Sequence, residues 1–347
     1  MIVTRTPLRL SLGGGGTDLP FYANKFGGSL VTASINKYIY IMVGDRLQGD
    51  IKLNYSQTEI IDSVQAIKHP LMREALKLTG INGSIEIHSM ADLPSGTGLG
   101  SSSAFLVGLL NALHYYKGEI ISRYKMAEDA SHITMDILKE PCGKQDQYAS
   151  AFGSINHLKI SPNGKVTVTP INITQETITR LEKNMMLFYT GFTREANEVL
   201  SEQKQKAEKE KSCEDKNSKK GKGKKEDKGI YSYYHEIKKI GDESKKCLEN
   251  GDLKRFGEWM NIHWELKKSI AESMSNSKID EWYALAMANG ALGGKIIGAG
   301  GGGFMVFYVD KNHDNFKGIM EKQGLVYVPF KFDFDGSRII YQENVMR

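Results

Sequence analysis

Residues Asp92–Ala104 read DLPSGTGLGSSSA, and this segment decides the fold. Alternating Ile85 and Ile87 precede it and predict a strand, and the Ala/Leu-rich run over 104–116 predicts a helix. The glycines therefore lie on a turn that opens a helix. Glycine allows a close backbone approach, and a helix N-terminus offers unpaired N–H groups to an anion. The pattern predicts a phosphate cradle whose serine hydroxyls reach a phosphate or a bound Mg²⁺ ion.

The segment departs from two common phosphate-binding fingerprints. Its G-x-G-x-G turn lacks the sixth-position Gly or Ala of a dinucleotide-binding loop, and G-x-x-x-x-G-K-[ST] occurs nowhere in the chain. A Ser/Gly-rich loop with a serine N-cap is the structural alternative.

Two further glycine runs favour ligand binding. Residues 7–20 read PLRLSLGGGGTDLP, and residues 295–304 read KIIGAGGGGF. Each adjoins apolar, strand-like sequence, so neither is typical of a linker. Four consecutive glycines cost ordering entropy in a folded domain, and close backbone approach to a ligand is a physical reason to keep them. Tight turns between strands are the alternative.

In order and approximate spacing, these three segments resemble the signature motifs of the GHMP small-molecule kinases. Within the family the chain is most similar to the bacterial D-glycero-D-manno-heptose-phosphate kinases. Supporting segments are residues 13–22, GKQDQY at 143–148, FYTG at 188–191 and GALGGK at 290–295. The resemblance implies an N-terminal ribosomal-S5-like domain over 1–175, a C-terminal ferredoxin-like domain over 176–347, and an active site in the cleft between them.

The pattern of elements agrees with an α+β fold. Strands are predicted near 31–43, 84–90, 165–169, 185–190, 295–297, 303–309, 325–332 and 337–342, and helices near 69–79, 104–116, 122–138, 194–208, 230–250, 253–273, 278–289 and 315–323.

Composition is that of an enzyme of the reducing cytoplasm. No apolar run is long enough to span a membrane, the first residues do not resemble a secretory signal, and Cys142, Cys213 and Cys247 have no paired spacing. No membrane or nucleic-acid partner is expected, and a homodimer is left open.

The net charge of +5 comes from one segment. Residues 204–228 hold eleven lysines against six acidic residues, and KNSKKGKGKKEDK at 216–228 has no apolar residue. We predict a disordered, solvated loop over 211–229. A polyanion-binding patch is the alternative, but no aromatic residue falls within this loop.

The cradle is expected to bind the phosphates of ATP. The resemblance places one Mg²⁺ ligand on Ser102, with Ser101 as the alternative, and each serine could instead cap the helix. The predicted ATP-binding residues are Pro94, Gly96, Gly98, Leu99, Gly100, Ser101, Ser102 and Ser103.

Two residues are expected to be catalytic. Asp146 resembles the family's aspartate that accepts the proton of the attacking hydroxyl, and a carboxylate is ionised at neutral pH. Arg9 could stabilise the charge of the travelling phosphoryl group. The alternatives are a loop aspartate bonded to its own backbone and a salt-bridged strand arginine.

The resemblance also implies a set of substrate-binding residues. Asp18 would accept hydrogen bonds from sugar hydroxyls, and its alternative is an N-cap. Arg194 is favoured, ahead of Lys25 and Lys295, to hold a distal substrate phosphate, and any of these is by default a surface charge. The predicted set is Gly14, Gly15, Thr17, Asp18, Lys144, Arg194, Gly301 and Gly302.

One position departs from the family pattern. Many relatives carry a glutamate twelve residues before the base, where it helps to hold Mg²⁺, and this chain has Thr134 there. The second protein ligand of the ion is therefore undetermined. Mg²⁺ usually keeps several waters, so a serine, phosphates and water would suffice.

These residues predict an ATP- and Mg²⁺-dependent kinase that phosphorylates the anomeric hydroxyl of a sugar phosphate. The favoured reaction converts D-glycero-D-manno-heptose 7-phosphate to the 1,7-bisphosphate on a route to GDP-heptose. The alternatives are a free-sugar kinase, such as an L-fucose kinase, and a catalytically silent relative that only binds sugar or nucleotide.

Overall fold

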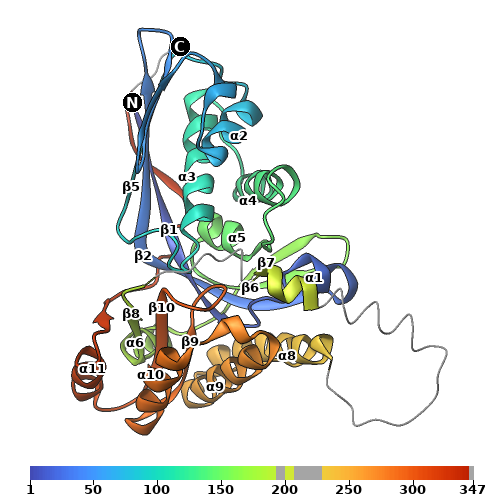
Figure 1. The fold of residues 1–347 in the computed structure, drawn as a ribbon, viewed down its shortest axis with the longest axis vertical. Coiled ribbons are helices and arrows are strands. Elements are labelled where there is room, and N and C mark those ends of the chain that lie inside the picture. The colour runs from blue at the N-terminus through green and yellow to red at the C-terminus, as the bar shows by residue number, and fades with distance from the viewer. Residues whose placement is uncertain (193–199, 207–228, 344–347) are drawn as a thin grey trace, which may run out of the picture.

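Two β-sheets organise the chain (Figure 1). The computed structural model describes residues 1–192, 200–206 and 229–343. Its strands are β1 Ile2–Gly13, β2 Gly28–Asp45, β3 Ile51–Asn54, β4 Thr58–Ile61, β5 Ile85–Ala91, β6 Ile155–Ile160, β7 Val166–Pro170, β8 Met185–Tyr189, β9 Ala291–Ile296, β10 Phe304–Val309, β11 Val326–Tyr327 and β12 Arg338–Gln342.

Helices pack against both sheets. They are α1 Pro20–Phe26, α2 Pro70–Thr79, α3 Ser101–Tyr116, α4 Arg123–Ser131, α5 Gln145–Phe152, α6 Gln175–Asn184, α8 Ile230–Asn250, α9 Leu253–Ile270, α10 Ser277–Ala288 and α11 His313–Glu321. Short 3₁₀ turns lie at Val64–Ala66 and Glu272–Met274, and a π-helical turn, η2, spans His132–Ile137. No helix in the described ranges is long and apolar enough to cross a membrane.

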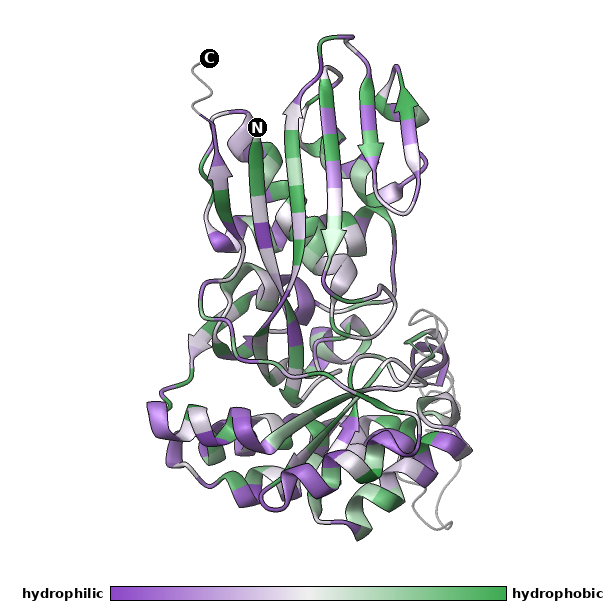
Figure 2. Ribbon diagram, turned by 90° about the vertical axis from the view of Figure 1, so that its left-hand side faces the viewer, coloured by the Kyte–Doolittle hydropathy of each residue, from purple (hydrophilic) through white to green (hydrophobic). Residues whose placement is uncertain are grey.

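The larger sheet has the order β12-β1-β2-β5-β3-β4, and the hairpin of β6 and β7 also pairs with β2. Its pairs are antiparallel except β3 with β5. Helices α2–α5 lie on one face (Figure 1). Hydrophilic and hydrophobic residues alternate along several of its strands (Figure 2), as expected for a sheet that packs one face against helices and leaves the other open.

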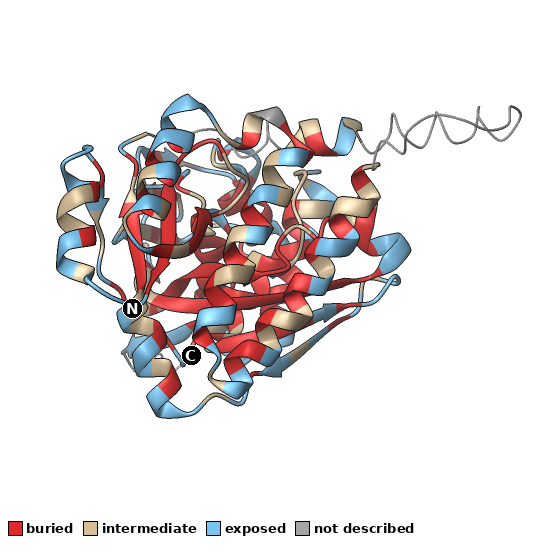
Figure 3. Ribbon diagram, turned by 90° about the horizontal axis from the view of Figure 1, so that it is seen from below, coloured by how far each residue is buried: buried red, intermediate tan, exposed pale blue. Residues whose placement is uncertain are grey.

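The smaller sheet has the order β11-β8-β10-β9. Strand β10, FMVFYV, is buried along its whole length, because helices pack on both of its faces. Figure 3 shows that buried residues are concentrated in the strands and on the inward sides of the helices. A cluster of buried side chains, including the aromatic residues Trp264, Phe307 and Phe316, forms a core between the smaller sheet and its helices.

Most of the predicted elements are found, and two differ. The predicted strand over 325–332 is reduced to Val326–Tyr327. The strand near 337–342 is present, but it pairs with β1 in the larger sheet. A loop aspartate was the alternative considered for Asp146, and the structure places this residue in the first turn of α5. The domain boundary near residue 175 stays a prediction. That boundary did not anticipate that the C-terminal strand β12 would pair with β1 in the sheet formed by the N-terminal residues.

Several predictions fall on residues outside the described ranges. Of the predicted loop over 211–229, only Gly229 is described. Of the predicted helix over 194–208, residues 200–206 are described and are helical. Cys142 and Cys247 are free thiols, and Cys213 lies outside the described residues.

Candidate active site

Arg9 and Asp146 form a two-pronged ion pair at the junction of the two sheets. Arg9 Nε donates to Asp146 Oδ1 and Arg9 Nη2 donates to Oδ2, both at 2.7 Å. Arg9 Nη1 also donates to the carbonyl of Gly98. The arginine is buried within the sheet, whereas the aspartate is 28% exposed. A guanidinium fork of this kind fixes the plane of the carboxylate and ties it to the glycine turn.

That glycine turn has the conformation expected of a cradle. Gly96, Gly98 and Gly100 have φ values of 71°, 82° and 77°, which disfavour residues with a side chain. Gly100 is the N-cap of α3, so Ser101–Ser103 form its first turn. The carbonyl of Leu99 accepts from the Arg9 amide at 3.0 Å, which places the turn directly beside the ion pair.

Some of the glycines approach protein backbone rather than open space. A Cβ on Gly98 would lie 2.2 Å from the Ile297 carbonyl oxygen, and one on Gly303 would lie 2.3 Å from that of Thr97. The glycine segments at 92–104 and 295–304 therefore pack backbone against backbone across the junction. Gly14 likewise lies against the Ser29 carbonyl. Close packing of one backbone segment against another is therefore a further reason for glycine at these positions.

Asp18 is buried next to the ion pair. Its Oδ2 accepts from the Gln145 amide at 3.0 Å, and its Oδ1 accepts from the Gly16 amide at 3.2 Å. Burial raises its pKa, and the nearby Asp146 charge acts in the same direction, while the two amides oppose this shift. Gly143 leaves the space for this carboxyl, because a Cβ there would lie 2.1 Å from Asp18 Oδ2.

These residues surround a cavity of about 650 Å³. Of the predicted residues, the lining includes Arg9, Gly15, Asp18, Gly96, Gly98, Gly100, Ser101, Ser102, Ser103, Asp146 and Gly302. Residues from all three glycine-rich segments, 7–20, 92–104 and 295–304, thus line one cavity.

Other predicted residues lie behind the lining. Thr17 Oγ1 donates to the carbonyl of Gly14 at 2.8 Å, so it holds the loop from within. The Gly301 amide donates to the Met274 carbonyl at 2.9 Å. Leu99 is fully buried, and the Pro94 carbonyl accepts from Thr97 Oγ1 at 2.9 Å.

Three of the predicted basic residues do not reach the cavity. Lys144 Nζ donates to Glu128 Oε2 at 2.8 Å and to the Gly164 carbonyl at 3.1 Å, so its geometry does not support a substrate role. Lys25 is exposed on α1, where its Nζ donates to the Tyr231 hydroxyl at 3.1 Å. Lys295 is buried 3.3 Å from His263 Nδ1, and burial lowers its pKa. Arg194 lies outside the described residues.

Lys267 on α9 is a cavity residue that the sequence did not single out. Its Nζ donates to the Gly298 carbonyl at 3.4 Å, a long contact. Burial lowers its pKa to about 8, Asp18 and Asp146 oppose the shift, and Arg9 adds to it. The neighbouring residue is also lysine, and only the tertiary fold distinguishes the two, so no local signal could have found it.

Glu140 is a second unexpected lining residue. It follows η2, and its amide donates to the Thr134 carbonyl at 2.9 Å. Burial raises the pKa of its carboxyl. Its position next to Pro141-Cys142-Gly143, just before the predicted base, was the only hint in the sequence.

Thr134 is not available to a metal ion. It is fully buried in η2, its Oγ1 donates to the Ala130 carbonyl at 3.0 Å, and the same atom lies 3.1 Å from the amide of Gln147. Among the described residues there is no group of three or more metal-binding side chains. A cation here would therefore depend on hydroxyls, one or two carboxylates, phosphate oxygens and water, a set that suits Mg²⁺.

The two serines that open α3 fit such an ion. Ser101 Oγ is buried and has no hydrogen-bond partner within the part of the chain that the structure describes. Ser102 is exposed, and both line the cavity. A buried hydroxyl without a partner costs free energy, and a cation or phosphate in the cavity would relieve that cost.

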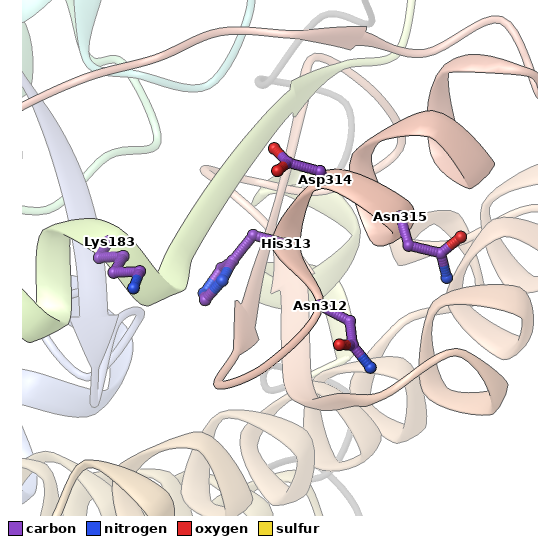
Figure 4. Close-up of a pocket in the computed structure, with 5 residues that line it drawn as sticks. All are labelled: Lys183, Asn312, His313, Asp314 and Asn315. Carbon is purple, nitrogen blue, oxygen red and sulfur yellow. The ribbon is translucent and has the colours of Figure 1, made fainter.

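A second hollow, of about 540 Å³, lies between α6 and α11 and shares no lining residue with this site. Figure 4 shows Lys183 and His313 extending toward one another there, while Asn312 and Asn315 point away. His313 Nε2 lies 3.0 Å from Asn184 Oδ1. This hollow contains none of the predicted site residues.

Comparisons with known proteins decide the family. The model for the GHMP kinases N terminal domain matches residues 62–154, and that for the GHMP kinases C terminal domain matches residues 244–322. A D-glycero-alpha-D-manno-heptose 7-phosphate kinase of Campylobacter jejuni is 32% identical over 352 residues, covering 96% of this chain and 97% of that protein. The chain belongs to the GHMP kinases.

Solved structures agree with this GHMP kinase in fold. A D-glycero-D-manno-heptose 1-phosphate kinase of Bacteroides thetaiotaomicron superposes with a TM-score of 0.77 at 24% identity, covering 99% of this chain and 100% of that one. The galactokinase of Lactococcus lactis gives 0.74 at 18% identity, with 97% and 94% covered. The predicted family and the α+β, two-domain fold class of this GHMP kinase are confirmed.

Proposed function

We propose that this GHMP kinase transfers the γ-phosphoryl group of ATP to the anomeric hydroxyl of D-glycero-D-manno-heptose 7-phosphate. The observation that carries the proposal is a carboxylate, Asp146, held by Arg9 beside a glycine cradle. The same cavity contains Lys267, to which no carboxylate of the described residues is bonded. The substrate is the one named for the relative that matches nearly the whole chain.

The residues divide the work of phosphoryl transfer, which is mostly positioning and charge neutralisation. The amides at the start of α3 would face the phosphates of ATP. Asp146 would accept the proton of the attacking hydroxyl. Arg9 would hold that carboxylate in place and offset the developing negative charge. Asp18 would accept hydrogen bonds from sugar hydroxyls. An Mg²⁺ ion, where bound, would neutralise charge on the phosphate oxygens.

Lys267 would bind the phosphate that the sugar already carries. The cavity lining holds two cationic side chains within the described ranges, Arg9 and Lys267, and Arg9 is already paired with Asp146. Lys267 makes one long contact with a carbonyl, so its ammonium can still bind an anion. A free sugar would leave this half-buried charge unpaired, which is unfavourable.

A phosphorus NMR experiment tests the function. The protein is incubated with Mg-ATP and D-glycero-D-manno-heptose 7-phosphate, and in a parallel sample with L-fucose. A new anomeric phosphate signal in the heptose sample alone is expected. A signal with fucose alone would move the protein to the free-sugar kinases, and ATP binding without consumption in either sample would favour a silent relative.

Replacing Lys267 with methionine tests the role of the ammonium. The side chain keeps its length but loses its charge, and a hydrogen bond to a charged group contributes about 1.5 to 3 kcal/mol. The KM for the sugar phosphate should therefore rise at least about tenfold, with the KM for ATP unchanged. Lys268, which pairs with Glu265 and does not line the cavity, provides the matched control.

The same role predicts a pH dependence. The pKa of Lys267 is lowered to about 8, so the ammonium is present below that pH and is lost as the pH rises through it. The charged groups acting on it are Asp18, Asp146 and Arg9, and its own charge helps to lower the pKa of His263 and of Lys295. The kcat/KM for the sugar phosphate should fall above pH 8, and this decrease should be absent from the pH profile of the Lys267→Met variant. An unchanged KM and the same decrease in both proteins would exclude the role.

A further inference from the structure

Glu140 is a carboxylate in the cavity that has no partner among the residues the structure describes. It is half-buried and lines the space, and none of its hydrogen bonds or ion pairs within the described ranges involves its side chain. The other two acids of the lining are satisfied, since Asp18 accepts from two amides and Asp146 is held by Arg9. A partly buried carboxylate without a donor or cation is unfavourable, so its place in the lining indicates a positively charged ligand.

The unpaired Ser101 hydroxyl points independently to a ligand in this cavity. Ser101 is 8% exposed, and its Oγ has no partner among the described residues. A hydroxyl and a carboxylate are oxygen donors, which hard divalent cations prefer, and Mg²⁺ typically takes one or two carboxylates together with substrate phosphates. The start of α3, where an anion is favoured, borders the same space and would bind the phosphates that share the ion.

The local backbone explains why position 140 can replace position 134. Thr134 stands where many members of the family have the glutamate that helps to hold Mg²⁺, and its hydroxyl is used inside η2. The hydrogen bond from the Glu140 amide to the Thr134 carbonyl places the two residues side by side. The chain turns sharply just before Glu140, because Lys139 has a φ of 57°. Glu140 is thereby brought to the cavity, which Thr134 does not line.

We propose that Glu140 supplies the protein carboxylate for the divalent cation that accompanies ATP, together with the hydroxyls of Ser101 and Ser102. The proposal rests on the proposed function only in requiring a bound nucleotide, and it does not depend on which sugar is phosphorylated.

Manganese binding tests the assignment without any phosphoryl transfer. The protein is saturated with ADP, Mn²⁺ is added stepwise, and free Mn²⁺ is measured by electron paramagnetic resonance. Glu140→Gln keeps the shape of the side chain and removes its charge. Loss of even an indirect supporting group lowers metal affinity 10- to 100-fold in other sites. We therefore expect Mn²⁺ to bind the variant–ADP complex at least about tenfold more weakly, with ADP affinity in EDTA unchanged.

Asp136→Asn is the matched control. Asp136 is a carboxylate of η2, but it is 67% exposed, pairs with His132 and does not line the cavity. Its replacement should leave Mn²⁺ affinity unchanged. Glu140→Asp, which retains a shorter carboxylate, should bind Mn²⁺ with an affinity between those of the wild type and Glu140→Gln. This variant also keeps the test informative should Glu140→Gln unfold, and thermal unfolding of every variant is measured alongside.

The opposite results are equally clear. Mn²⁺ affinity of Glu140→Gln or Glu140→Asp within twofold of the wild type overturns the assignment. An unchanged Mn²⁺ affinity with a raised KM for the sugar also overturns it, and makes Glu140 a sugar-binding residue. Failure of the sugar reaction with Glu140-dependent Mn²⁺ binding would refute the proposed substrate and leave the metal ligand standing.

Discussion

Asparagine in place of Asp146 is expected to lower kcat by at least about 100-fold, the lower end of the contribution of a general base. The amide has the same size as the carboxylate, but it cannot accept the proton of an attacking hydroxyl. Because Arg9 donates two hydrogen bonds to Asp146, one of them would face the NH₂ group of the amide. We expect the affinity for an ATP analogue to change little, because the cradle amides lie on a different segment.

The control for this variant is Asp314→Asn. Asp314 is an exposed carboxylate on α11 that lines the second hollow (Figure 4) and not the active-site cavity, so its replacement should leave kcat unchanged. A kcat within tenfold of the wild type for Asp146→Asn would mean that Asp146 serves mainly to neutralise Arg9. Measuring kcat by coupled ADP release and analogue binding by calorimetry separates the chemical step from nucleotide binding.

Alanine at Gly98 should be among the most damaging single methyl additions in the chain. The residue has a φ of 82°, and the new Cβ would lie 2.2 Å from the Ile297 carbonyl oxygen. The left-handed conformation alone costs about 1 to 2 kcal/mol, and overpacking against rigid backbone adds roughly 1 to 3 kcal/mol. We expect the free energy of unfolding to fall by at least about 2 kcal/mol, with weakened ATP binding, because the cradle and the 297–303 segment must separate.

Gly118→Ala distinguishes the clash from the backbone strain. Gly118 follows α3 with a φ of 79°, but a Cβ there meets no atom within 4 Å. The Gly118→Ala variant should lose only the part of the free energy of unfolding that comes from the left-handed backbone, about 1 to 2 kcal/mol, and its affinity for ATP should be unchanged. Equal losses of stability in the two variants, measured by chemical denaturation, would show that the close backbone contact across the junction contributes nothing.

The fold was predictable where local pattern and tertiary structure agree. The turn at residues 96–100 followed by α3 was foreseen, because glycine spacing and an apolar run are local signals. Strand β12 was foreseen as a strand but not as a neighbour of β1, since pairing across the whole chain leaves no local trace. Helix α5 was missed because it is short and its buried face includes polar residues such as Gln145 and Gln147.

The site was predictable to a similar degree. The resemblance led to Arg9, Asp18 and Asp146, and the structure brings all three into one cavity. The pairing of Lys144 with Glu128 on α4 was not foreseen, because the neighbours of Lys144 in sequence carry no sign of this distant partner. Lys267 and Glu140 were missed because each gains its environment only when distant segments meet, and a lone lysine or glutamate in a polar stretch has no distinctive pattern.

The return of the chain through β12 limits how the two halves can move. The polypeptide passes from the larger sheet to the smaller one after β7 and passes back between β11 and β12, where it pairs with β1, the strand that carries Arg9. The two halves are thus joined by two covalent crossings. We expect these crossings to allow the halves to rotate relative to one another about the line that joins the crossings, and to oppose rotation about other axes. The cleft should therefore open and close along a single path, so that Arg9 and the 297–303 segment meet in the same relative orientation each time.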